Sequence, residues 1–138
     1  MSNQSKTIAR KVFEDIQSQG NLALIDEIVV SDYVGHTPPT NIHGPEGAKQ
    51  YVTLLREAFP DLQFTVEDQI AEGDRVVTRW TFRGTHKGQF QGMPPTGKQV
   101  TMNGSTTFRI ANSKIVEGWN NPDLLGMLQQ LGAVPEPG

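Results

Sequence analysis

Asp123 is the residue in this chain of 138 residues whose type and position best fit acid/base chemistry. It follows the stretch Trp119–Pro122, between a predicted last strand and a short apolar helix. Aromatic and apolar neighbours would desolvate its carboxylate, raise its pKa and make it a better base toward a carbon acid. A carboxylate in the first turn of a helix is also stabilised by the helix dipole and by free N–H groups. The sequence therefore leaves two roles open for Asp123, a catalytic base and a structural residue.

Three histidines are the other side chains that titrate near neutral pH. His36 lies in a turn-like segment and could bind a substrate carbonyl, relay a proton or hold the local backbone. His86 comes where a strand passes into a loop, which fits either a pocket rim or a solvated loop. Six residues separate His36 from His43 and 42 separate His43 from His86, so no pair shares a helix face as zinc-binding histidines do. We therefore predict no metal site, and the absence of cysteine excludes thiolate ligands.

Gly92–Lys98 matches the spacing of a phosphate-binding loop, but its residues do not suit a phosphate. Gln99 stands where a serine or threonine would hold magnesium, and Pro94 and Pro95 lack the N–H groups that bind an anion. A predicted strand follows in place of a helix N-terminus. We therefore expect no nucleotide cofactor, and interpret Met93–Pro95 as a pocket rim or a surface loop.

The side chains most able to line a ligand pocket are large and apolar or aromatic. They are Tyr51, Phe59, Trp80, Met102 and Trp119. Core packing explains each of them equally well. Asn103 and Arg109 lie on the polar parity of a predicted strand. If that parity faced a pocket, both could hold an oxyanion, and Arg109 could stabilise an enolate or a carboxylate.

Apolar periodicity predicts the elements that must position these residues. Helical spacing covers residues 8–16, 22–29 and 48–59, and a period of two covers residues 62–70, 76–83, 100–110 and 114–120. Residues 31–44 are predicted to form a turn region between the second and third helices. Ile70 is expected to share one strand face with Phe64 and Val66. Asn121–Pro122 is predicted to cap and begin a last short helix, which Gly132 ends.

Three helices followed by about four strands form the α+β pattern, with helices on one face of a curved antiparallel sheet. Such a sheet leaves a hollow in which a small molecule could bind. Apolar parities on both sides of the sheet suggest a second buried face, and hence a homodimer through the sheet. We expect one domain over residues 1–138, with residues 1–5 and 133–138 as loose tails.

The charge and hydropathy of the chain exclude several partners. The net charge is −3 and the twelve lysines and arginines are scattered, which argues against sequence-independent binding of nucleic acid. No apolar stretch approaches the roughly 20 residues of a membrane span, and the N-terminus lacks the apolar run of a signal peptide. We therefore predict a cytoplasmic protein with no nucleic-acid or membrane partner.

The later part of the chain carries a series of short motifs whose order and spacing are specific when taken together. The motifs are Phe59–Leu62, Glu72–Val76, Gly84–Gly88, Gly92–Lys98, Phe108–Ile110, Lys114–Glu117, Trp119, Asp123 and Gln130–Gly132. On these motifs the chain resembles the SnoaL-like polyketide cyclase family of the nuclear transport factor 2-like superfamily, over nearly its whole length.

The resemblance implies a cone-shaped α+β barrel, with three helices folded over a curved sheet and a deep apolar pocket. It also implies intramolecular aldol cyclisation of aromatic polyketide intermediates, without metal or organic cofactor. The catalytic acid/base of the family is an aspartate just after the last strand, which corresponds to Asp123. The cyclases also use a histidine on the penultimate long strand; this chain has none there, and Arg109 or Asn103 lies nearest.

The leading hypothesis is a cofactor-free cyclase or isomerase that acts on a hydrophobic carbonyl compound. Asp123 would remove a proton next to a carbonyl, and His36, Asn103 or Arg109 would hold the developing oxyanion. The alternatives are a non-catalytic small-molecule-binding or dimeric scaffold and, among enzymes, a hydratase or lactonising variant. An Asp123 that faces an apolar cavity favours chemistry, whereas one bonded only to its own helix favours a structural role.

Overall fold

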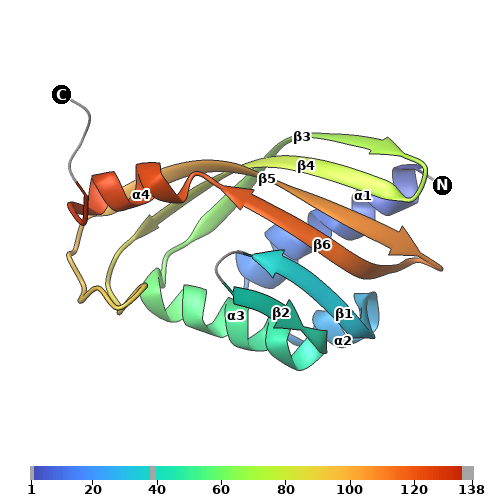
Figure 1. The fold of residues 1–138 in the computed structure, drawn as a ribbon, viewed down its shortest axis with the longest axis horizontal. Helices are drawn as coiled ribbons and strands as arrows, with labels where there is room; N and C mark the ends of the chain where they lie inside the picture. The colour runs from blue at the N-terminus through green and yellow to red at the C-terminus, as the bar shows by residue number, and fades with distance from the viewer. Residues whose placement is uncertain (1, 38–39, 135–138) are drawn as a thin grey trace.

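The computed structural model describes residues 2–37 and 40–134, which form a mixed six-stranded sheet and its covering helices (Figure 1). The helices are α1 Ser2–Lys11, the π-helix η1 Val12–Gln17, α2 Ala23–Ile28, α3 Gly44–Ala58 and α4 Leu124–Leu131. The strands are β1 Val29–Thr37, β2 Thr40–His43, β3 Gln63–Glu72, β4 Arg75–Thr85, β5 Gln99–Ala111 and β6 Lys114–Pro122. The strand order is β2-β1-β6-β5-β4-β3. The expected α+β class is confirmed.

The first helical segment changes its hydrogen-bond spacing along its length. After α1 the helix widens into η1, where Ser18 N–H bonds to the Phe13 carbonyl at 3.1 Å, five residues back. Phe13 and Ile16 are buried, each 2% exposed, so the predicted apolar face does meet the sheet. The chain is already helical at Ser2, within the predicted tail at residues 1–5. Of the predicted tail at residues 133–138, residues 135–138 lie outside the described part of the chain.

Strands β4 and β5 are the two longest strands of the sheet and carry much of its inner face, the face toward the helices. Trp80 and Phe82 on β4 are buried and pair with Gly104 and Met102 on β5. Gly104 leaves room for the Trp80 ring, because a Cβ at that position would lie 2.5 Å from two ring atoms. The predicted alternation on these two strands is therefore confirmed.

The prediction for Ile70 is wrong because β3 contains a β-bulge. The pairing with β4 shifts between Val66 and Asp68, which turns the following residues to the opposite face. Phe64 and Val66 point inward, whereas Ile70 lies opposite Val77 on the outer face and is 69% exposed.

The predicted turn region at residues 31–44 instead contains β1, β2 and the start of α3. Strand β1 pairs parallel with β6, with Gly35 opposite Gly118, and antiparallel with β2. The sheet is therefore mixed and open, not wholly antiparallel. Parallel pairing of distant segments leaves no local turn signal, and Gly35 interrupts the apolar alternation of β1.

The last helix begins later than predicted. Strand β6 continues through Pro122, and Asp123 is the N-cap of α4, in place of Asn121. Gly132 ends α4 with φ 84°, as predicted. The side chain of Gln130 holds α4 on β5, because it accepts from Thr101 N–H at 2.9 Å and donates to the Thr101 carbonyl at 2.8 Å.

Candidate active site

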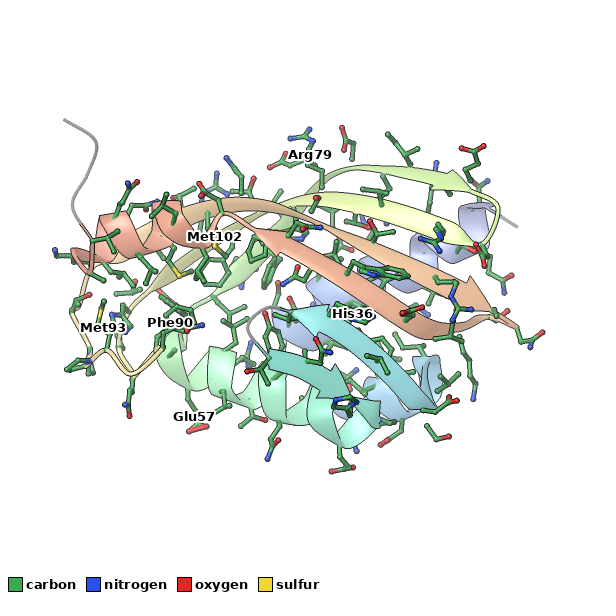
Figure 2. All side chains as sticks on the ribbon, in the orientation of Figure 1. His36, Glu57, Arg79, Phe90, Met93 and Met102 are labelled. Atoms are coloured by element: carbon green, nitrogen blue, oxygen red, sulfur yellow. The ribbon has the colours of Figure 1, made fainter. Side chains whose placement is uncertain are left out.

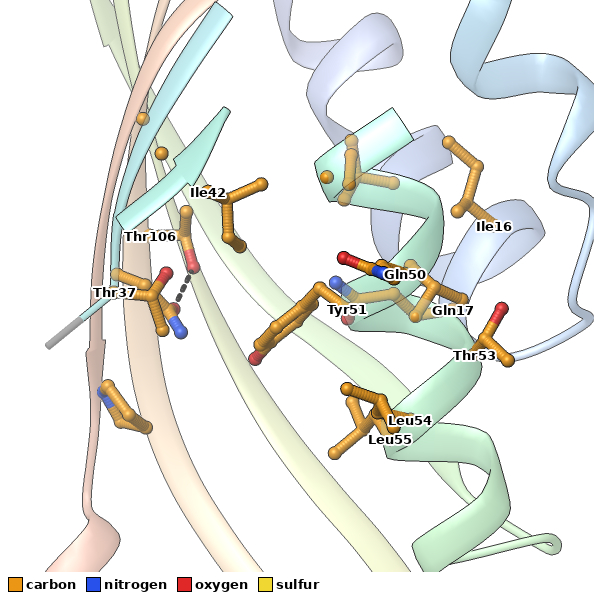
Figure 3. Close-up of a pocket in the computed structure, with 18 of the residues that line it drawn as sticks. Ile16, Gln17, Thr37, Ile42, Gln50, Tyr51, Thr53, Leu54, Leu55 and Thr106 are labelled. Carbon is orange, nitrogen blue, oxygen red and sulfur yellow. Dashed lines mark hydrogen bonds between the residues drawn. The ribbon is translucent and has the colours of Figure 1, made fainter. Parts of the chain in front are cut away.

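An open cavity of about 1580 Å³ lies between α3 and the inner face of the sheet. Figure 3 shows Tyr51 pointing from α3 toward the sheet, where Thr37 and Thr106 lie opposite. Trp80 and Met102 line the wall formed by the sheet. The walls are mainly apolar, so polar groups inside the cavity determine what chemistry it could carry.

The main polar feature of the cavity is a chain of hydrogen bonds across three neighbouring strands. The Trp80 indole N–H on β4 donates to Thr106 Oγ1 on β5 at 3.0 Å. The Thr106 hydroxyl donates to Asn120 Oδ1 on β6 at 2.8 Å (dashed in Figure 3). Both Thr106 and Asn120 line the cavity.

Two tyrosines and one glutamine add further polar atoms to the cavity wall. Burial raises the pKa of Tyr51, and burial together with Tyr51 raises the pKa of Tyr33. Both phenols are therefore neutral at physiological pH and can donate a hydrogen bond. The side-chain oxygen of Gln17 is buried and has no hydrogen-bond partner in the described part of the chain. A ligand hydroxyl would suit that oxygen.

Asp123 lies beside the cavity and is exposed to solvent. Its Oδ1 accepts a hydrogen bond from Gly126 N–H at 3.0 Å, in the first turn of α4. Its neighbours Pro122 and Leu124 both line the cavity, but Asp123 itself does not. The carboxylate thus has the capping geometry that we associated with the structural role.

His36 and Arg109 meet on the outer face of the sheet, opposite the face that carries the helices. His36 Nε2 lies 2.8 Å from Glu117 Oε2, and Arg109 donates to Glu117 Oε1 at 3.4 Å. Hydrogen bonding from His36, together with Arg109, lowers the pKa of Glu117. His36 also stacks on Trp119, which lines the cavity at its margin. These two of the three candidate oxyanion holders are therefore joined through Glu117, on the face opposite the polar chain at Thr106.

The remaining predicted site residues divide between the cavity and other parts of the fold. Tyr51, Trp80, Met102 and Trp119 line the cavity. Phe59 is fully buried and packs edge-on against Phe82, with ring centroids 5.1 Å apart, so it belongs to the core. Asn103 is exposed on the outer face, where its side chain accepts from Thr81 Oγ1 at 3.2 Å.

Sequence reasoning missed Thr106 and Asn120 as candidate site residues. A signal for Thr106 was present, because it is a polar residue on the apolar parity of a strand, between Met102 and Phe108. Asn120 gave no comparable signal, since it lies in a polar stretch near the end of β6. Within residues 2–37 and 40–134, the structure contains no group of three or more side chains that could hold a metal ion.

The loop between β4 and β5 closes one end of the cavity. Figure 2 labels two side chains of this loop, Phe90 and Met93. Phe90 lines the cavity, and its backbone exchanges hydrogen bonds with Met93 at 3.1 and 2.8 Å. His86, predicted for a rim or a solvated loop, is fully buried, and its Nδ1 accepts from Thr96 N–H at 3.2 Å. Its ring packs against Phe59, with centroids 5.6 Å apart. His86 therefore anchors the loop to the core.

Comparison with known proteins assigns the family. The model of the SnoaL-like polyketide cyclase family matches residues 7–131. The aklanonic acid methyl ester cyclase DnrD of Streptomyces peucetius is 30% identical over 138 residues, which cover 96% of this chain and 92% of that protein. The nogalonic acid methyl ester cyclase of Streptomyces nogalater is 33% identical over 113 residues, with 78% and 83% coverage.

A crystal structure from Jannaschia sp. CCS1, described as of SnoaL-like type, has a TM-score of 0.87 at 27% identity and covers 96% of this chain and 94% of that one. This chain belongs to the SnoaL-like polyketide cyclase family. The prediction of a SnoaL-like cyclase enzyme is therefore confirmed. No helix in the described residues is long and apolar enough to cross a membrane.

Proposed function

We propose that this enzyme closes a ring in a hydrophobic compound with several carbonyl groups, by an intramolecular aldol step within the cavity. A methylene carbon next to one carbonyl loses a proton, and the resulting enolate carbon bonds to a second carbonyl carbon. The alkoxide that forms then takes up a proton, so the product is an isomer of the substrate. No oxidant, reductant or second substrate is needed for this step.

The observation that carries the proposal is the mainly apolar cavity with hydrogen-bonding groups at Thr106, Asn120 and Tyr51. Apolar walls can bind the hydrocarbon surface of a folded substrate, while a few polar groups fix its carbonyl oxygens. Holding the two reacting carbons about 3–3.5 Å apart supplies much of the rate enhancement in an intramolecular reaction. The two relatives named as methyl ester cyclases support a substrate of this class.

Asp123 is our proposed proton acceptor. It stands between two residues that line the cavity, and its cap bond to Gly126 occupies Oδ1. Its Oδ2 makes no hydrogen bond to any residue that the structure describes, so this oxygen is free to accept a proton. Positioned general bases contribute about 10²- to 10⁴-fold to the rate of a proton transfer.

The test uses purified protein and aklanonic acid methyl ester, with ring closure followed by liquid chromatography. Asp123→Asn keeps a good helix cap but cannot accept the proton, so we expect a fall in kcat of about a hundredfold or more. Asp68→Asn is the matched control, because Asp68 is an exposed carboxylate paired with Arg79 on the outer face. If Asp123→Asn closes the ring at the wild-type rate, Asp123 is not the base. If wild-type protein closes no ring in this ester or in nogalonic acid methyl ester, the proposed substrate class is wrong.

We further propose a homodimer formed through the outer face of the sheet. This face is largely polar and charged, contrary to the apolar parity expected from the sequence, but Ile70 and Val77 form an exposed apolar pair on it. Sedimentation velocity at micromolar concentration should show a species of twice 15.2 kDa. Val77→Lys should shift it toward the monomer, and a wild-type protein that sediments only as a monomer would remove the proposal. The expected cytoplasmic location stays a prediction.

A further inference from the structure

The hydrogen bonds that join Trp80, Thr106 and Asn120 have only one satisfactory direction. An indole N–H can only donate, so Thr106 Oγ1 must accept from Trp80. The hydroxyl hydrogen of Thr106 then needs an acceptor, and Asn120 Oδ1 lies 2.8 Å away. Trp80 and Thr106 are only 2% and 5% exposed, so the two buried polar groups rely on these bonds.

This direction also fixes which end of the Asn120 amide faces Thr106. If the amide were turned around, its NH₂ group would donate to Thr106 Oγ1, which already accepts from Trp80. The buried hydroxyl hydrogen of Thr106 would then have no acceptor in the chain, at a cost of about 1–3 kcal/mol. Asn120 Oδ1 therefore accepts, and its NH₂ group is the free end. That NH₂ group makes no hydrogen bond to any residue in the described part of the chain, although Asn120 lines the cavity.

We propose that the Asn120 side-chain NH₂ holds the substrate oxygen on which negative charge develops, and that Thr106, fixed by Trp80, is its positioning residue. This inference rests on the proposed function, because it assigns an oxyanion donor to that reaction. The donor is neutral, lies in a mainly apolar cavity and is oriented before substrate binds. Donors of this kind lower the barrier most when they need not reorganise during the reaction.

The inference also accounts for a difference between the sequence and the structure. The residues predicted to hold the oxyanion were His36, Asn103 and Arg109, all of which project on the outer face. Asn120 projects on the inner face, because it pairs with Thr106 on β5. The carbonyl that accepts from Asn120 would lie beside Trp80 and Met102, so an extended aromatic or polyketide ring system can pack along that wall.

The test compares two probes of nearly equal shape, 2-naphthol and 2-methylnaphthalene, by NMR titration of isotope-labelled protein. The first carries an oxygen that resembles an enolate oxygen, and the second carries a methyl group in its place. Wild-type protein should bind 2-naphthol about tenfold or more tightly than 2-methylnaphthalene, which corresponds to one hydrogen bond to a charged or polarised oxygen. The side-chain NH₂ signal of Asn120, assigned by its loss in Asn120→Asp, should shift with naphthol only.

Four variants, one of them a control, separate the donor from its support. Asn120→Leu should bind both probes equally, because leucine has a similar size but no NH₂ donor; it also removes the acceptor of the Thr106 hydroxyl, so its folding is checked first. Thr106→Val should lower the preference for naphthol, since the amide is no longer held, and Thr106→Ser should restore it. Asn121→Leu is the control, because it makes the same substitution at the next residue, which is exposed on the outer face. It should leave the preference for 2-naphthol unchanged.

The outcomes distinguish this inference from the proposed function. If both probes bind wild type in the cavity but naphthol has no advantage, or its advantage survives Asn120→Leu, Asn120 is not the oxyanion donor and the apolar cavity still stands. If Asn120→Leu fails to fold, two other measurements decide the same question. They are the shift of the Asn120 NH₂ signal in wild type with 2-naphthol, and the preference of Asn120→Asp for 2-naphthol over 2-methylnaphthalene. If neither probe binds wild type, both proposals fail together.

Discussion

The His36 imidazole and the Glu117 carboxylate lie 2.8 Å apart on the outer face of the sheet, although 81 positions separate them in the sequence. The parallel pairing of β1 with β6 creates this contact, since it sets His36 beside Trp119 and Val34 beside Glu117. The same carboxylate accepts from Arg109 on β5. One acidic side chain therefore links the three neighbouring strands β1, β6 and β5, and its charge should affect how this part of the sheet responds to acid.

Glu117→Gln should make the stability of the protein less sensitive to acid. Hydrogen bonding from His36 and Arg109 lowers the folded-state pKa of Glu117 below its ordinary value of 4.5. A lowered folded-state pKa gives a stabilising contribution that is full above the unfolded-state pKa and is lost as the pH falls through the folded-state pKa. The free energy of unfolding, measured with urea between pH 7 and pH 3, should therefore fall more steeply below about pH 4.5 for wild type than for the variant.

The control for this prediction is Glu46→Gln, because Glu46 is a largely exposed carboxylate on α3. It should leave the acid limb of the stability profile nearly unchanged. Parallel pH profiles for wild type and Glu117→Gln would contradict the linkage of Glu117 to the folded state.

Gly104→Ala should destabilise the centre of the sheet. The added Cβ would lie 2.5 Å from two atoms of the buried Trp80 ring and 3.0 Å from the Asn121 carbonyl oxygen. Neither the ring nor the backbone can move away without disturbing the core, and overpacking of this kind costs about 1–3 kcal/mol. Urea unfolding measured by tryptophan fluorescence checks the value. Ser105→Ala, on the outer face of the same strand, should change stability by less than about 0.5 kcal/mol.

The elements that local pattern predicted well are those whose partners are close in the sequence. The third helix has a strong apolar stripe between Pro45 and Pro60, and β4 and β5 alternate in phase. Strands β5 and β6 are joined directly by the tight turn at Asn112 and Ser113, where φ is 53° and 62°, so their pairing needs no distant segment. In each case one segment of sequence carried the whole signal.

The parts that sequence pattern did not predict depend on contacts between distant segments. Strands β1 and β2 form because β6 offers a parallel edge to residues some eighty positions earlier, and no local turn marks that pairing. The bulge after Val66 turns Ile70 outward without any glycine or proline at the position. The Trp80–Thr106–Asn120 chain unites three strands, so its members cannot be grouped until the register is known.

Asp123→Ala and Asp123→Asn should differ in stability, whatever their effect on catalysis. The Asp123 carboxylate caps α4 through Gly126 N–H. Asparagine caps about as well as aspartate, whereas alanine loses the bond at a cost of about 1 kcal/mol. The melting temperature of Asp123→Asn should therefore lie near that of wild type, and the melting temperature of Asp123→Ala should be lower. Equal melting temperatures for the two variants would show that the cap bond contributes nothing to stability.

His86→Ala should loosen the loop that closes one end of the cavity. His86 is fully buried against Phe59, and its backbone hydrogen-bonds with Lys98 and Gly97 in the part of the loop that leads into β5. Removing the ring leaves a void and frees Thr96 N–H from Nδ1, so we expect a loss of about 2–4 kcal/mol. Amide hydrogen exchange should rise over residues 87–97 more than in α4.

Binding in the cavity provides a second measure of the same change. Phe90, carried by this loop, lines the cavity, so a loosened loop should weaken the binding of 2-methylnaphthalene as well as of 2-naphthol. This effect differs from that of Asn120→Leu, which should remove only the preference between the two probes. Lys87→Ala is the control, because the Lys87 side chain is exposed and its backbone N–H still bonds the Ala58 carbonyl at 2.9 Å. If His86→Ala shows the same amide hydrogen exchange and the same affinity for the two probes as Lys87→Ala, the buried ring does not hold the loop.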